Sequence, residues 1–123
     1  MRVRTKLVTF LMVPFLLCAN AIAGFETIEV AEIQHVKRAE GIVRDTSGAP
    51  VAGVKILLRE SGSKKEVANV QSHLDGHFAV RHLPPGEYEM HVNAKGFDPM
   101  LYHLKIDPQG ARSLLIVKMQ VGT

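Results

Sequence analysis

The chain has 123 residues, which is enough for one domain with a single hydrophobic core. Its 15 basic and 12 acidic residues give a net charge of +3 with the histidines neutral. Arg2, Arg4 and Lys6 account for this excess, because 15 minus these three leaves 12 basic residues. The rest of the chain therefore has a net charge near zero, which gives no support to nucleic-acid binding.

The first 23 residues have the pattern of a secretory signal peptide. The three basic residues precede an apolar stretch from Leu7 to Leu17, and Ala21-Ile22-Ala23 supplies the small residues that signal peptidase accepts. We therefore predict a signal-peptide helix over residues 1–23, cleavage near Ala23/Gly24, and a secreted or periplasmic protein. The apolar stretch is shorter than the roughly 20 residues that a spanning helix requires, so we expect no stable membrane span after cleavage. A retained membrane anchor is the alternative.

Cys18 is the single cysteine of the chain and lies within this segment. Lipid attachment at Cys18 is a further alternative, although bulky Leu17 stands where lipoprotein signals usually carry a small residue. If Cys18 is lost on cleavage, the mature chain has neither a disulfide nor a thiolate metal ligand.

Residues 24–39 form a lead-in whose secondary structure the sequence leaves open. Acidic residues recur at every third position from Glu26 to Glu32, and apolar residues do the same from Val30 to Val36, which suits a helix. Thr27-Ile28-Glu29-Val30, in contrast, alternates as a strand does. A helix and an edge strand are both compatible with this segment.

From Gly41 onward the apolar residues recur at every second position. This period predicts strands with one buried and one solvated face. The alternating runs lie at residues 54–58, 78–80, 88–92, 102–106 and 115–121. With about seven short strands at intervals of about 8 to 12 residues, residues 40–123 are predicted to form a single all-β domain, an antiparallel β-sandwich.

Turn-forming residues separate these runs. In DTSGAPVAGV, residues 45–54, Asp45 can accept a backbone N–H two residues on, and Gly48 can adopt a positive φ. Asp75-Gly76 and the Pro85-Gly86 pair of LPPG are further turn signals. Tyr88 follows the second of these and is predicted to be either a corner tyrosine with a bonded hydroxyl or a core aromatic.

Two stretches carry a resemblance to a known family. GIVRDTSGAPVAGVKI (41–56) and LDGHFAVRHLPPGEYEMHVNAKGF (74–97) together resemble the carboxypeptidase regulatory-like domain, a transthyretin-like (prealbumin-type) β-sandwich. Each fragment alone is common, but their order and spacing over about 65 residues make the joint match specific.

The resemblance implies a non-catalytic accessory domain without a cofactor. Such domains occur beside metallocarboxypeptidase domains, on many bacterial surface proteins, or alone behind a signal peptide, and related sandwiches bind carbohydrate or protein surfaces. None of the six histidines begins the H-x-x-E pattern of the carboxypeptidase zinc site. A transthyretin-like hydrolase is a further alternative, but its C-terminal Tyr-Arg-Gly-Ser is missing here, and we expect no enzyme.

The histidines suggest a metal-binding alternative. His73, Asp75 and His77 place two imidazoles and a carboxylate within five residues, and these are zinc-ligand types. His82 is expected to lie too far away, because five strand residues span about 16 Å. His91 and His103 have outward parity in their predicted strands and could approach each other if those strands pair.

The segment that follows Gly96 is apolar where a loop is usually polar. Phe97, Met100 and Leu101 are therefore candidate contact residues for a partner, the alternative being that Phe97 folds back onto the sandwich. The sequence thus predicts a non-catalytic secreted or periplasmic module with a structural role or a protein or glycan partner at the cell envelope. Metal binding through the surface histidines is the alternative function.

Overall fold

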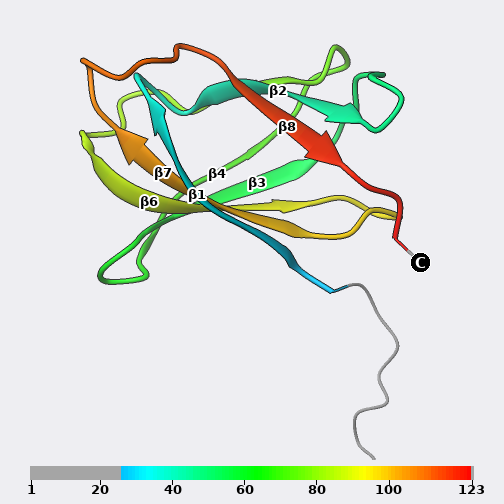
Figure 1. Ribbon diagram of the computed structural model, residues 1–123, viewed down its shortest axis with the longest axis horizontal. Coiled ribbons are helices and arrows are strands. Elements are labelled where there is room, and N and C mark those ends of the chain that lie inside the picture. Colours follow the sequence, from blue (N-terminus) through cyan, green and yellow to red (C-terminus); the bar gives the residue numbers. More distant parts are fainter. Residues whose placement is uncertain (1–25, 123) are drawn as a thin grey trace, which may run out of the picture.

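The computed structural model describes residues 26–122, which form two β-sheets that pack face to face (Figure 1). The predicted all-β sandwich is confirmed. The described residues contain no helix, and hence none that is long and apolar enough to cross a membrane. The predicted signal-peptide helix lies outside the described residues.

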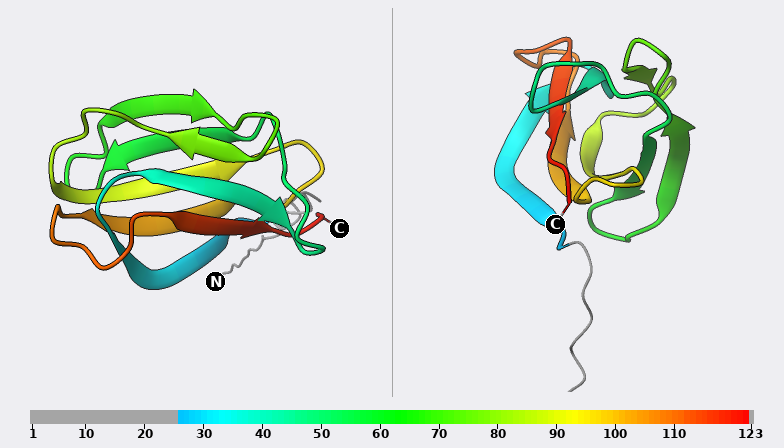
Figure 2. Two further views of the ribbon diagram at one scale, coloured as in Figure 1. Left: turned by 90° about the horizontal axis from the view of Figure 1, so that it is seen from above. Right: turned by 90° about the vertical axis from the view of Figure 1, so that its right-hand side faces the viewer.

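Eight strands make up the two sheets. In chain order they are β1 (Ile28–Val36), β2 (Glu40–Asp45), β3 (Lys55–Glu60), β4 (Glu66–Gln71), β5 (His77–Ala79), β6 (Gly86–Asn93), β7 (Met100–Ile106) and β8 (Leu115–Met119). The larger sheet has the order β1-β7-β6-β3-β4, and the smaller sheet has the order β5-β2-β8. Figure 2 shows the two sheets as separate layers around a common interior.

Two of the strand pairs are parallel. β1 pairs with β7 and β2 pairs with β8 in parallel, whereas β2–β5, β3–β4, β3–β6 and β6–β7 are antiparallel. The architecture thus differs from a purely antiparallel sandwich at these two pairs. Alternating side chains are common to both kinds of pairing, so the sequence period does not distinguish them.

The lead-in forms an edge strand rather than a helix. Ile28 and Val30 pair with Met100 and Tyr102 of β7 and pack against the core, whereas Glu29 between them is exposed. The register shifts between Val30 and Ile33, and Val36 is again fully buried at the end of the strand. Burial of these alternate apolar side chains favours the strand over the helix.

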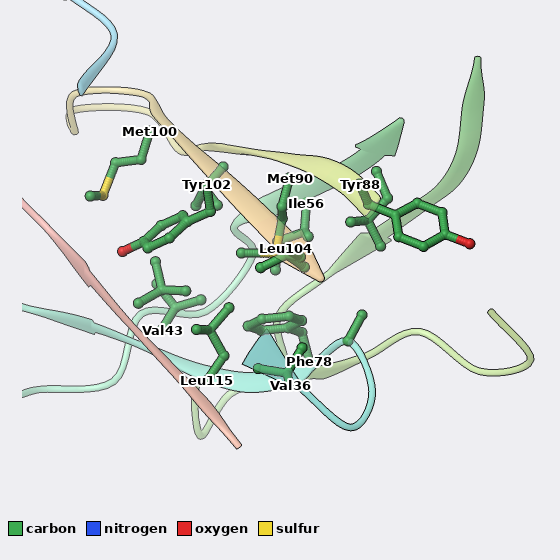
Figure 3. Packing of buried hydrophobic residues seen from close by; sticks show 14 of the residues in the cluster. Val36, Val43, Ile56, Phe78, Tyr88, Met90, Met100, Tyr102, Leu104 and Leu115 are labelled. Atoms are coloured by element: carbon green, nitrogen blue, oxygen red, sulfur yellow. The ribbon is translucent and has the colours of Figure 1, made fainter. Parts of the chain in front are cut away.

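The core lies between the two sheets and consists of the inward residues of the alternating runs. Figure 3 shows Phe78 of the smaller sheet pointing toward Leu104 and Ile56 of the larger sheet. Phe78 is the largest side chain that is fully buried. It belongs to β5, which is only three residues long, so burial of this ring helps to anchor the strand beside its pairing with β2.

The turn that begins at Asp45 is organised by its own side chains, as predicted. The carboxylate of Asp45 accepts hydrogen bonds from the backbone N–H groups of Ser47 (2.9 Å) and Ala49 (3.0 Å) and from the Ser47 hydroxyl (2.6 Å). The Ser47 hydroxyl is the main cause that lowers the pKa of Asp45 below its ordinary 3.8. Gly48 follows with a φ of 91°, which confirms the predicted positive φ, a conformation that favours glycine.

Ser72 fixes the other end of this loop. Its buried hydroxyl donates to the carbonyl of Val51 (2.8 Å) and accepts from the N–H of Val54 (2.9 Å). These two bonds satisfy buried backbone groups where the loop enters β3. The stretch from Asp45 to Val54 thus shapes the backbone between β2 and β3.

Replacement of Gly41 by alanine tests the close approach of β2 to its neighbours. A Cβ at Gly41 would lie 2.2 Å from the Leu115 carbonyl oxygen and 2.9 Å from the Phe78 ring. We expect Gly41→Ala to destabilise the fold by about 2 kcal/mol or more, because backbone and a buried ring must both move. Urea unfolding of the purified protein measures this change.

Gly62→Ala is the matched control, because nothing lies within 4 Å of a Cβ at Gly62. An equal loss of stability in the two variants would contradict the tight packing inferred at Gly41.

Candidate functional site

A pocket of about 350 Å³ lies at the end of the smaller sheet where β5 ends. Five titratable side chains line it, namely Arg38, Glu40, His77, Arg81 and His82. We call this set the basic pocket, because four of its members are basic residue types and only Glu40 is acidic. The turn between β1 and β2, which carries Arg38, lies at the same end of the molecule as the start of β6 (Figure 1).

The pairing of β2 with β5 places the centre of the pocket. Glu40 pairs with Ala79, and Ile42 pairs with His77, so these side chains share the outer face while Phe78 points into the core. Glu40 Oε2 lies 2.8 Å from His77 Nε2, and Glu40 Oε1 lies 3.3 Å from Arg38 Nε. The one carboxylate of the pocket is thus shared between two basic groups.

Arg81 and His82 differ from the other basic groups of the pocket. Within residues 26–122 neither of them takes part in an ion pair, and both are exposed. His82 has a φ of 62°, a left-handed conformation that non-glycine residues seldom adopt. Such a conformation costs of order 1 kcal/mol and persists only where the surroundings impose it.

Two hydrogen bonds hold the segment that carries these residues. The Val80 N–H donates to the Ala39 carbonyl (2.8 Å), and the Tyr88 hydroxyl donates to the Pro84 carbonyl (2.6 Å). Tyr88 therefore fills both of its predicted roles, because its hydroxyl is bonded and its ring is buried in the core. Burial is the main cause that raises its pKa, so the phenol keeps its proton and remains a donor at neutral pH.

The predicted metal ligands occupy the loop that leads into β5. The His73 and His77 rings stack with their centroids 6.3 Å apart and an interplanar angle of 14°. The Asp75 carboxylate, however, accepts a hydrogen bond from the His77 backbone N–H (2.9 Å), and His77 Nε2 bonds to Glu40. Among residues 26–122 there is no group of three or more His, Cys, Asp or Glu side chains that could hold a metal ion. The structure brings the two rings together, but not the three residues as a ligand set.

His82 lies in the same pocket as His77, although the sequence analysis placed it about 16 Å away. That distance assumes an unbroken strand, but β5 ends at Ala79 and the chain turns at His82. Arg38, Glu40 and Arg81 were not predicted as site residues. The only signal for the pocket was the density of histidines between residues 73 and 82.

The three candidate contact residues near Gly96 do not form an exposed tip. Phe97 is half-buried, packs against the core and forms a bridge with Val121. Met100 is 6% exposed and begins β7, and Leu101 lies on the outer face of the larger sheet opposite His91. Their role as contact residues for a partner stays a prediction.

The outer face of the larger sheet carries a second polar cluster, in which His91 and His103 are not directly opposite each other. The strand register places His103 opposite Glu89, and His91 opposite Leu101. His103 Nε2 lies 2.7 Å from Glu29 Oε2, and His91 Nε2 is buried with no hydrogen-bond partner among residues 26–122, 3.8 Å from Glu89 Oε1. The two histidines therefore each approach a carboxylate rather than a shared metal position.

These observations define a β-sandwich module with a basic pocket at one end. Residues 38–120 match the model of the family described as the carboxypeptidase regulatory-like domain. The chain belongs to this family, which confirms the resemblance found in the sequence. The family and the fold fit a non-catalytic module.

Solved structures with a similar fold come from different kinds of protein. The major pilin subunit BcpA of Bacillus cereus has a TM-score of 0.55 and 21% identity over 65% of this chain and 27% of the pilin chain. Hydroxyquinol 1,2-dioxygenase from Pseudomonas putida DLL-E4 has a TM-score of 0.50 and 14% identity over 93% of this chain and 66% of that chain. This chain therefore spans about a quarter of the pilin subunit, and at these identities the likeness is one of fold alone. No protein among the curated sequences compared matches this chain.

Lys64 is expected to control the ionisation of Glu89. The Lys64 ammonium donates a hydrogen bond to the Glu89 carboxylate, and this bond is the main cause that lowers the pKa of Glu89 below its ordinary 4.5. A lowered pKa in the folded state stabilises the fold above about pH 4.5, and this stabilisation is lost as the pH falls through the folded-state pKa. Lys64→Gln should therefore raise the pKa of Glu89 and reduce the loss of stability on acidification.

Carboxyl NMR titration and urea unfolding at several pH values measure these two effects. Lys65→Gln is the matched control, because the exposed neighbour Lys65 forms no ion pair within residues 26–122. A Glu89 pKa that is the same in both variants and the parent would contradict this role of Lys64.

Proposed function

We propose that this protein is a secreted or periplasmic, non-catalytic module that binds a protein partner at the cell envelope through the basic pocket. The observation that carries the proposal is the pocket itself, in which unpaired basic groups lie on a segment held by hydrogen bonds at both ends. A concave, largely pre-formed site with a few converging polar groups is the usual form of a binding site. The signal-peptide pattern of residues 1–23 supports the extracytoplasmic location.

The lining of the pocket favours binding over catalysis. It contains no hydroxyl, thiol or amine side chain that could act as a nucleophile. Its one carboxylate is engaged by two basic side chains, with Glu40 Oε1 3.3 Å from Arg38 Nε and Glu40 Oε2 2.8 Å from His77 Nε2. The remaining lining residues, Ala79, Val80 and Leu83, are apolar.

A protein partner is favoured over a glycan by the aromatic content of the surface. Sugar-binding surfaces usually present aromatic rings, whereas this chain has no tryptophan and its two tyrosines are 4% and 6% exposed. Arginine is enriched at protein interfaces and is a frequent hot-spot residue. The two arginines of the pocket therefore suit a protein surface better than a neutral sugar.

The proposal predicts where in the cell the protein is found and that it binds an envelope protein. The full chain with a C-terminal tag, expressed in a bacterial host, should be recovered outside the cytoplasm with an N-terminus near Gly24, as determined by mass spectrometry of the intact protein. Crosslinking to an envelope extract should retain a protein with the parent chain but not with Arg81→Gln. Arg44→Gln is the matched control, because exposed Arg44 lies on β2 and does not line the pocket.

Two results would overturn the proposal. One is an uncleaved chain that remains in the cytoplasm. The other is an envelope protein that both variants retain as well as the parent does, because that binding would not use the basic pocket.

A further inference from the structure

We infer that the basic pocket recognises a peptide carboxylate, either an acidic side chain or a chain terminus, of the bound protein. This inference rests on the proposed function and names the chemical group that the pocket selects. Four basic residue types surround one carboxylate, so the pocket has an excess of positive charge whenever its two arginines are charged. An anionic group on the ligand balances this excess.

The arginines supply the geometry for a carboxylate. A guanidinium is planar and can donate two parallel hydrogen bonds to the two oxygens of a carboxylate. Arg81 takes part in no ion pair within residues 26–122, so the N–H donors of its guanidinium are available to a ligand. Arg38 contacts Glu40 through Nε, the nitrogen nearest its aliphatic stem. Both arginines thus retain terminal N–H donors that a ligand can use.

His82 adds a donor that is held in position. His82 has a left-handed φ of 62° and lies between Val80 and Pro84, whose backbone groups are both fixed by hydrogen bonds. A backbone segment that is fixed before binding loses less conformational freedom when the ligand arrives. The strained residue is therefore suited to a binding role, with the strain imposed by the two anchors around it.

Glu40 and the apolar lining residues further restrict which ligands fit the pocket. The Glu40 carboxylate would repel a second carboxylate, but the Arg38 guanidinium beside it offsets its charge. Ala79, Val80 and Leu83 offer short apolar contacts beside the charged groups. A peptide with small apolar residues next to an acidic group matches both features, whereas an acidic sugar matches only the charge.

The test measures binding of short peptides to the purified mature chain by NMR. The probe is the hexapeptide Gly-Ala-Glu-Ala-Glu-Ala. It is compared with its C-terminally amidated form, with the form in which both glutamates are glutamine, and with the amidated glutamine peptide, which carries both changes. Backbone amide shifts at Arg81 and His82 should respond to the acidic peptide and not to an amidated glutamine peptide. The amidated and glutamine forms tell whether the carboxylate comes from the terminus or from a side chain.

Four single substitutions give different expectations. Arg81→Gln should weaken binding by about tenfold or more, because a charge-assisted hydrogen bond is lost. Glu40→Gln should tighten binding, because the repelling charge is removed and Arg38 is released. Arg44→Gln should leave binding unchanged, although it removes the same charge from the same face of the smaller sheet. His82→Gly should weaken binding while the fold keeps its stability, because glycine tolerates the left-handed φ.

Several results would overturn the inference. These are equal weakening by Arg81→Gln and Arg44→Gln, weaker binding in Glu40→Gln, or equal binding of the amidated glutamine peptide. Binding of an oligogalacturonate without binding of the peptide would assign the pocket to an acidic glycan instead.

The inference and the proposed function fail separately. Pocket-dependent capture of an envelope protein without any response to acidic peptides would refute the carboxylate inference alone. A clear peptide response without any envelope protein retained would refute the proposed protein-binding function alone.

Discussion

The contact between Phe78 and Gly41 is the constraint on which the functional end of the molecule depends. Phe78 is fully buried, and its ring lies so close to Gly41 that a Cβ there would overlap it. Burial of a phenylalanine ring contributes about 2 to 3 kcal/mol, which is large for a strand of three residues. Because side chains alternate along a strand, fixing Phe78 inward directs His77 and Ala79 outward. The core residue thereby positions the pocket residues on either side of it.

The passage of the chain from one sheet to the other completes the pocket. β1 belongs to the larger sheet and β2 to the smaller one, so residues 37–39 must cross between the layers. Val36 and Ala39 are buried on the two sides of this crossing, and Lys37 donates its N–H to the Arg112 carbonyl (2.8 Å). Arg38 is therefore held at the rim beside Glu40, even though nothing buries its own side chain.

The period of the apolar residues was sufficient to predict the layers of the fold but not their connections. Strands with a fully buried face, such as β6 and β7, were evident because Tyr88, Met90 and Val92 alternate with polar residues. β4 gave no such signal, because Val67, Ala68 and Val70 are all only half-buried at the edge of the sheet. The parallel partners of β1 and β8 depend on long-range packing, which no local pattern encodes.

The candidate site was harder to predict for the same reason. Its residues come from the β1–β2 crossing, from β2, from β5 and from the segment after β5, and only the histidines stood out as a group in the sequence. Reading His73, Asp75 and His77 as ligands assumed that neighbours in sequence would converge. In the structure the Asp75 carboxylate accepts from the His77 backbone N–H, and His77 turns to Glu40, which lies 37 residues earlier in the chain.

Net charge alone conceals how the charges are arranged on this protein. Without the three basic residues before Leu7, the basic and acidic groups are equal in number, at 12 each. On the larger sheet two of the carboxylates each have a basic residue type beside them, because Glu29 contacts His103 and Glu89 contacts Lys64. At the basic pocket one carboxylate faces two arginines, so the excess there must be offset by acidic groups elsewhere. A surface that is neutral as a whole therefore limits non-specific attraction of anions, while the pocket remains locally selective for them.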